Sequence, residues 1–118
     1  MNRQLKFRVW DNEQKKFEYF ELHNITVPDR LLTQDKSPLQ QYTGIKDSEQ
    51  IDIYEGDIVR GKFFDTDYRH LKTINSEVVW IERYACFNIG IEEWRYSGEP
   101  VTIIGNIFEN SELLNNEN

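Results

Sequence analysis

The sequence predicts a single, mainly β domain of antiparallel strands over residues 1–110. Short runs of alternating or β-branched residues recur along the 118-residue chain, and glycines or polar clusters separate them. No amphipathic segment is long enough to supply a core helix. Aromatic residues make up 14% of the chain, which is typical of small β proteins with large core side chains. Sequential hairpins of this kind favour a small SH3-like or related barrel with a packed N-terminal hairpin and little helix.

The N-terminal region, residues 1–27, is predicted to contain that hairpin. Apolar side chains alternate with polar or aromatic ones along residues 5–10, which indicates a half-buried strand. The polar run at residues 11–16 can turn the chain, and residues 17–22 have the pattern of a second strand. Residues 28–38, bounded by two prolines, are expected to connect the hairpin to the rest of the domain.

Residues 39–110 are predicted to form the barrel-like region. Gly44 and Gly56 fall between β-type runs, where glycine can adopt a positive φ that other residues resist. Residues 64–75 have weak periodicity and are expected to form an exposed hairpin tip. The polar tail, residues 111–118, is expected to fray. The strands of this region are expected at residues 39–45, 51–54, 58–63, 77–82, 86–91 and 101–104.

Charge and composition limit the setting and the partners. The net charge is −7, and residues 49–118 carry six Lys or Arg against fourteen Asp or Glu. Such acidity repels phosphate backbones, so nucleic acid is not the expected partner. No apolar run approaches the ~20 residues that a membrane helix needs. Cys86 is the only cysteine, which excludes an internal disulfide, and we expect a soluble protein of a reducing, cytoplasmic compartment.

No pattern indicates a catalytic, cofactor or metal site, and we expect no enzyme and no cofactor. Asp52, Glu55 and Asp57 are close in sequence but lack the EF-hand spacing, so we expect solvated turn carboxylates. His23 and His70, with one cysteine, cannot build a closed zinc site. Nucleophile-elbow and phosphate-loop motifs are also missing. We therefore expect acid groups in water and no pocket organised for catalysis.

Four segments carry a family resemblance. They read KFRVWD at residues 6–11, QYTGIKD at 41–47, YEGDIV at 54–59 and IGNIFENSEL at 104–113. In this order they resemble the YopX family of small phage and prophage proteins, over most of residues 3–114. The family commonly has a glycine in the turn before the YEGD block, where this chain has residues 48–50 without one. The resemblance implies a small, mainly β, phage-derived protein inside a bacterial cell, and it transfers no catalytic residues.

The main functional hypothesis is a non-enzymatic protein-binding or assembly module, which binds a protein partner or a second copy of itself. Motif positions and surplus aromatic residues define the candidate partner surface: Tyr42, Gly44, Asp47, Tyr54, Glu55, Gly56, Asp57, Trp94, Tyr96 and Asn106. The same positions also have an architectural interpretation. In that interpretation the glycines shape turns, while Asp47, Asp57 and Asn106 hydrogen-bond nearby backbone.

Two alternative functions stay open on the sequence. An acidic protein can mimic DNA and occupy a host DNA-binding protein, which requires an ordered stripe of carboxylates. A weak nucleic-acid binder would instead use the basic residues of the N-terminal hairpin, whose binding should weaken steeply as salt rises. Those residues are Arg3, Lys6, Arg8, Lys15 and Lys16.

Overall fold

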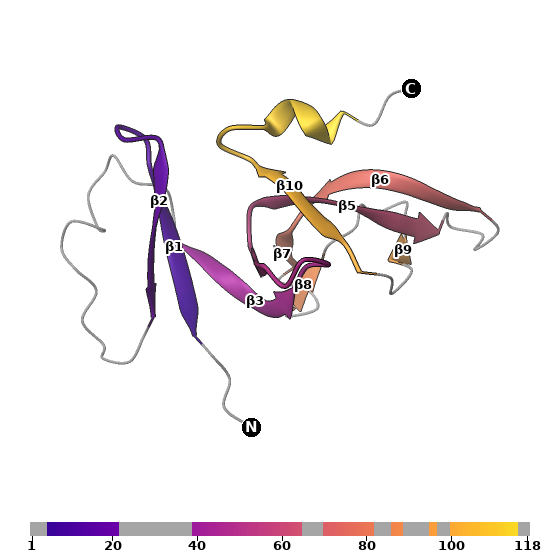
Figure 1. The fold of residues 1–118 in the computed structure, drawn as a ribbon, viewed down its shortest axis with the longest axis horizontal. Helices are drawn as coiled ribbons and strands as arrows, with labels where there is room; N and C mark the ends of the chain where they lie inside the picture. The colour runs from indigo at the N-terminus through magenta and orange to yellow at the C-terminus, as the bar shows by residue number, and fades with distance from the viewer. Residues whose placement is uncertain are drawn as a thin grey trace.

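The computed structural model describes residues 5–21, 39–64, 70–81, 86–88, 95–96 and 100–115, which are mainly antiparallel strands (Figure 1). The strands are β1 (Lys6–Asp11), β2 (Lys16–Glu21), β3 (Gln40–Lys46), β4 (Asp52–Tyr54), β5 (Asp57–Phe64), β6 (Leu71–Glu77), β7 (Val79–Ile81), β8 (Cys86–Asn88), β9 (Arg95–Tyr96) and β10 (Thr102–Asn106), and a 3₁₀ helix, η3, covers Ser111–Leu114. In this part of the chain, one sheet has the order β2-β1-β3-β4 and another the order β10-β5-β6, with β9 also on β5. The sheets curl into a half-barrel, which confirms the predicted fold class.

The predicted N-terminal hairpin is confirmed. β1 and β2 pair antiparallel from Lys6 opposite Glu21 to Asp11 opposite Lys16. Asp11 organises the turn, because its Oδ1 accepts hydrogen bonds from the backbone N–H groups of the second and third residues after it. β1 then pairs with β3 on its other edge, which carries the sheet from the hairpin toward the barrel (Figure 1).

The alternation in β1 predicted one buried and one exposed face, and this prediction was wrong. Arg8 and Trp10 are buried although they lie on the face opposite Val9, which is also buried. The reason is tertiary: the face of β1 that carries Arg8 and Trp10 packs on residues of the barrel and of the segment after β10. A strand that is covered on both sides shows no exposed face, whatever its alternation suggests.

Both glycines have the positive φ that the sequence predicts, but only Gly56 lies in a turn, because Gly44 lies within β3 at an irregularity of the strand. Gly44 has φ +92° where the register of β3 against β4 shifts, and Gly56 has φ +86° in the turn between β4 and β5. Gly56 also has no space for a Cβ, which would collide with the side chain of Gln40. The turn before the YEGD block contains Gln50 at φ +68°, so a non-glycine residue holds a left-handed conformation there.

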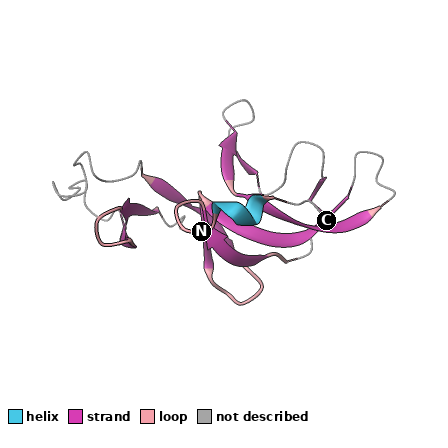
Figure 2. Ribbon diagram, turned by 90° about the horizontal axis from the view of Figure 1, so that it is seen from above, coloured by secondary structure: helices cyan, strands magenta, loops and turns pink. Residues whose placement is uncertain are grey.

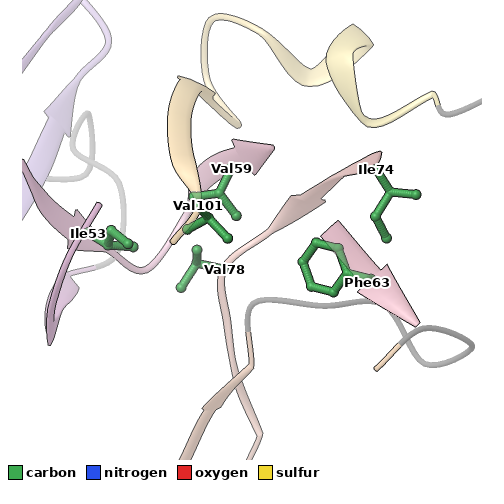
Figure 3. Close-up of a cluster of buried hydrophobic side chains, with 6 residues drawn as sticks. All are labelled: Ile53, Val59, Phe63, Ile74, Val78 and Val101. Atoms are coloured by element: carbon green, nitrogen blue, oxygen red, sulfur yellow. The ribbon is translucent and has the colours of Figure 1, made fainter. Parts of the chain in front are cut away.

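The apolar core lies where β5 meets its neighbours. Figure 3 shows that Val59 and Val101 lie close to Val78, while Phe63 lies beside Ile74. All of these side chains are at most 2% exposed, as is Ile53, which completes the cluster. The long β5–β6 hairpin supplies half of this cluster, namely Val59, Phe63 and Ile74, and Phe64 pairs with Leu71 at its far end.

Three predictions about the later strands have different outcomes. The pairing of β7 with β8 confirms the hairpin expected around residues 77–91, with Ile81 opposite Cys86. Residues 71–75 are not part of an exposed tip, because they belong to β6 and pair with β5 along their length. Residues 111–114 do not fray as expected: they form η3, which lies against the barrel (Figure 2), and Asn75 Nδ2 donates to the Leu113 carbonyl at 2.8 Å.

Some predictions fall outside the described residues. These are the connection at residues 28–38, the position of Trp94 and the tip at residues 65–69. The domain boundaries that the sequence suggests therefore stay a prediction. Within the described part of the chain, no helix is long and apolar enough to cross a membrane.

Candidate functional site

A cleft of about 750 Å³ lies between the N-terminal hairpin and the barrel. One wall comes from β1 and β2, and the other from the end of β3, residues 50–52, β4 and β10. The cleft therefore exists only because the hairpin is held at a fixed orientation beside the barrel. The sequence pattern predicted no pocket organised for catalysis and gave no sign of this cleft.

A buried ion pair between Arg8 and Asp57 forms the floor of the cleft. The Nη2 atom of Arg8 lies 2.9 Å from Asp57 Oδ1, and both side chains are about 5% exposed or less. Arg8 Nε donates to Gln40 Oε1 at 2.7 Å, and Nη2 donates to the Glu55 carbonyl at 3.1 Å. The backbone N–H of Tyr54 donates to the other carboxylate oxygen of Asp57 at 2.7 Å. One guanidinium thus joins β1, β3 and the β4–β5 turn.

The protonation equilibrium of Asp57 follows from this burial. Desolvation raises the pKa of the Asp57 carboxyl, while the positive charge of Arg8 and the N–H of Tyr54 act in the opposite direction. Burial is the larger effect, and the pKa is raised overall. The prediction that Asp57 is a solvated turn carboxylate was wrong, because the packed hairpin removes it from water.

A continuous row of aromatic rings crosses from the segment after β10, over the hairpin, to the barrel. The successive rings are Phe108, Trp10, Phe17, Tyr19, Tyr54 and Tyr42, with centroid separations of 5.3, 4.9, 6.0, 5.5 and 5.7 Å. The Arg8 guanidinium lies 3.8 Å from the ring centre of Phe17 and 4.9 Å from that of Tyr54. Tyr19 is 60% exposed, so the row reaches solvent at the wall of the cleft.

Burial also determines the protonation state of the Tyr54 hydroxyl in this row. Desolvation raises the pKa of the Tyr54 hydroxyl to about 12, with the negative charge of Asp52 adding to the effect. The phenol therefore stays neutral at physiological pH and contributes an aromatic surface rather than a proton-transfer group.

Two lysines share one carboxylate at the rim of the cleft. The Asp52 carboxylate accepts hydrogen bonds from Lys6 Nζ at 3.0 Å and from Lys46 Nζ at 2.5 Å. Partial burial acts to raise the pKa of Asp52, but hydrogen bonds from both lysines outweigh it and the pKa is lowered. The hydrogen bond to Asp52 raises the pKa of Lys46 in turn. Lys6 also lies 5.1 Å from the ring centre of Tyr42. This group carries an excess of one positive charge.

Asp47 and Asn106 make the backbone hydrogen bonds that the architectural interpretation predicts. Asp47 accepts from the N–H groups of Glu49, Ile51 and Ile103 at 2.8 to 3.0 Å. Burial acts to raise the pKa of Asp47, yet these three hydrogen bonds lower it overall. The Oδ1 atom of Asn106 accepts two backbone N–H groups in the turn after β10, each at 3.0 Å.

The ten predicted partner-surface positions are only partly brought together. Tyr54, Asp57 and Asn106 line the cleft, whereas Tyr42 and Asp47 are buried beside it. The remaining positions are spread: Gly44 is exposed, Gly56 is buried in its turn, Glu55 is half-buried, Tyr96 lies in β9, and Trp94 is outside the described residues. Whether these positions meet a partner stays a prediction.

The sequence did not point to Tyr19, Lys46 or the paired state of Asp52, and it suggested nucleic-acid binding for Arg8 rather than a buried ion pair. Arg8 and Asp57 both fall in motif segments, the first and the third of the four. Opposite charges in two separate motifs are a signal that a buried pair joins those segments. No comparable signal marks Tyr19 or Lys46.

Comparisons with known proteins give a family and a fold. The family model described as YopX protein matches residues 6–115. The comparison with curated proteins found no match. Among solved structures, the crystal structure of protein EF1440 from Enterococcus faecalis is similar with a TM-score of 0.55 and 21% identity. The match covers 93% of this chain and 97% of that chain, and it bears on the fold alone.

Proposed function

This chain belongs to the YopX protein family, and from that premise we propose that it is a non-enzymatic protein-binding module. Its binding site is the cleft between the N-terminal hairpin and the barrel. The observation that carries the proposal is the exposed Tyr19 ring in the wall of this cleft, supported within a row of aromatic rings by contacts with Phe17 and Tyr54. The partner is a protein of the phage or of its bacterial host.

The state of the charged groups supports binding over catalysis. Arg8 and Asp57 neutralise each other in the floor, and Asp52 is held by two lysines at the rim. A general acid or base needs a proton-transfer group within reach of a substrate and with a suitable pKa. Each of these ionised groups already has a partner within the fold, and we therefore propose a structural role for them.

The wall of the cleft supports a protein partner. Tyr19 presents a large amphipathic ring that contacts the Tyr54 ring edge to face, with ring centroids 5.5 Å apart. This contact fixes the position of the Tyr19 ring. Rigid tyrosines are enriched among the residues that contribute most to protein–protein binding, because they bury area at a small entropic cost. Ile51, on the opposite side of the cleft, is also exposed and adds apolar surface.

Affinity capture with a matched control tests this proposal. The tagged chain, Tyr19→Ala and Leu71→Ala are each used to capture proteins from lysate of the bacterial host, and binding is then measured with the purified partner. Leu71 is an exposed apolar residue outside the cleft. We expect Tyr19→Ala to weaken binding about 30-fold, as loss of a hot-spot tyrosine does, and Leu71→Ala to leave it unchanged.

The result that would overturn the proposal is a partner that both variants bind as tightly as the natural chain, or capture of no partner at all. Light scattering of the purified chain shows whether the partner is a second copy. An assembly that survives Tyr19→Ala would place self-association elsewhere on the molecule and count against the cleft as its site.

Four charged residues on which the two alternative functions would rely are engaged within the fold. Arg8, one of the basic residues assigned to nucleic-acid binding, is buried and paired with Asp57. Lys6 is paired with Asp52. The same pairs neutralise two of the carboxylates on which a DNA mimic would rely, so they do not contribute to a phosphate-like stripe.

A further inference from the structure

We infer that the partner presents an acidic segment, with a carboxylate next to an aromatic or large apolar side chain. The carboxylate is bound by Lys46 and Lys6 at the rim of the cleft, and the apolar side chain packs on Tyr19. This inference rests on the proposed function, because it names the chemistry of the segment that the cleft receives.

The exposed lysine at the rim has N–H donors that can bind a second carboxylate. Each lysine ammonium has three N–H donors, and Asp52 is the acceptor that the structure shows for Lys46 in the described part of the chain. The side chain of Lys46 is 47% exposed, so its remaining donors are accessible. Two ammonium groups on one carboxylate give the group of Lys6, Lys46 and Asp52 one positive charge, and Glu21 lies opposite Lys6 across β1 and β2.

The electrostatic setting of the cleft is unusual for this chain. The chain carries a net charge of −7, which opposes the approach of any acidic partner. The cleft is lined by three cations, Lys6, Arg8 and Lys46, and by three carboxylates, Glu21, Asp52 and Asp57. The charges of the lining therefore sum to zero, because Glu21 offsets the positive charge of the group of Lys6, Lys46 and Asp52. An acidic segment meets less repulsion in this neutral cleft than the net charge of the chain implies, and Glu21 disfavours its carboxylate on the β2 side.

The aromatic half of the recognition follows from Tyr19. Its ring contacts Phe17 and Tyr54, with centroids 6.0 and 5.5 Å away, and still leaves most of its surface exposed. A ring supported in this way stacks on an incoming aromatic or apolar side chain without losing much conformational freedom. Specificity thus combines a charged contact at the rim with a stacking contact on the wall.

An NMR titration of the ¹⁵N-labelled chain tests the inference with two defined probes, the peptides acetyl-Glu-Trp-Glu-amide and acetyl-Gln-Trp-Gln-amide. We expect the acidic peptide to shift the amide signals of Tyr19, Lys46 and Asp52 and to saturate at millimolar concentration. The neutral peptide should bind about fivefold more weakly, which is the upper range for one partly exposed ion pair. Added salt should reduce the difference between the peptides.

Matched variants assign the preference to the rim. Lys46→Gln should abolish the difference between the two peptides, while Lys62→Gln, at an exposed lysine outside the cleft, should preserve it. Equal binding of both peptides at the cleft would overturn the preference for acid while leaving the proposed binding site intact. If neither peptide shifts the cleft signals, the inference is wrong, and the capture experiment with Tyr19→Ala decides the proposed function separately.

Discussion

The barrel core and the hairpin–barrel junction are held together by different interactions. The core is an apolar cluster around β5, with Val59 and Phe63 fully buried. The junction contains a buried ion pair, Arg8 with Asp57, surrounded by aromatic rings. Apolar contacts are non-directional and depend on volume, whereas the ion pair depends on the presence and orientation of each partner.

This difference explains how a cleft can persist between two parts of a small domain. A purely apolar junction would draw the hairpin and barrel together until they excluded water. Here strand pairing holds β1 to β3, and the Arg8 guanidinium adds directional hydrogen bonds to Gln40, its register partner, and to the Glu55 carbonyl. The core thus contributes stability, and the junction contributes a defined orientation of the hairpin.

The largest expected effect comes from the core. Phe63→Ala removes a fully buried ring and leaves a cavity, so it should reduce the free energy of unfolding by about 4 kcal/mol. Urea denaturation followed by far-UV circular dichroism measures this loss. Leu71→Ala, an exposed residue on the neighbouring strand, is the control and should change stability little. Similar effects of both changes would contradict the assignment of the core.

The next largest effect tests the junction. Arg8→Met leaves the Asp57 carboxylate buried without its cation and should cost about 3 kcal/mol at pH 7. Burial already raises the pKa of Asp57, and loss of Arg8 raises it further, so protonation relieves the penalty as the pH falls. Thermal unfolding at pH 7 and pH 5 measures the change.

The double variant Arg8→Met with Asp57→Leu sharpens the same test. Because it removes both charges, it should recover most of the stability that Arg8→Met loses. Its amide NMR spectrum should nevertheless show that the hairpin no longer has a single orientation beside the barrel. A double variant as unstable as Arg8→Met would mean that Arg8 acts through its ring contacts rather than through the ion pair.

A smaller loss of stability is expected at Asp47, whose carboxylate accepts backbone hydrogen bonds in a turn, whereas Asp57 is paired with a cation. Asp47→Asn replaces one of its acceptor oxygens by an NH₂ group and should cost about 1–2 kcal/mol at pH 7. The folded state lowers the pKa of Asp47, so its ionised form stabilises the fold above the unfolded pKa, which is about 4. That stabilisation is lost as the pH falls through the folded pKa.

The free energy of unfolding, measured from pH 7 down to pH 2, tests whether the contribution of Asp47 falls with pH as expected. The difference between the natural chain and Asp47→Asn should shrink on the acid side, where Asp47 becomes protonated. A difference that stays constant over this range would show that the charge of Asp47 has no role in its hydrogen bonds.

The smallest expected effect is a gain in stability at a backbone position. Gln50 has φ +68°, a conformation that glycine adopts without steric cost, so Gln50→Gly should stabilise the fold by about 0.5–1 kcal/mol. Lys15→Gly, at φ +56° in the hairpin turn, is the matched change in the other region. Melting temperatures of both variants measure the effect. A loss of stability in Gln50→Gly would contradict the claim that the backbone of Gln50 is strained.

Several features could be predicted because they depend on a few neighbouring residues. The β1–β2 hairpin follows from alternation on both sides of a polar turn, and Asp11 supplies the turn's hydrogen bonds from within it. The positive φ values at Gly44 and Gly56 follow from the freedom of glycine itself. The family resemblance, carried by four motif segments, was likewise present in the sequence and is confirmed over residues 6–115.

The cleft and its charges were decided by tertiary structure. Arg8 and Tyr19 belong to strands whose pattern says which side chains share a face, but not which face meets the barrel. Burial of Arg8 depends on Asp57, which lies in a different strand far along the chain. The sequence by itself determined where strands and turns form, because local backbone preferences act over a few residues. Only packing of distant segments decided which polar groups leave water, because desolvation depends on everything that surrounds a group.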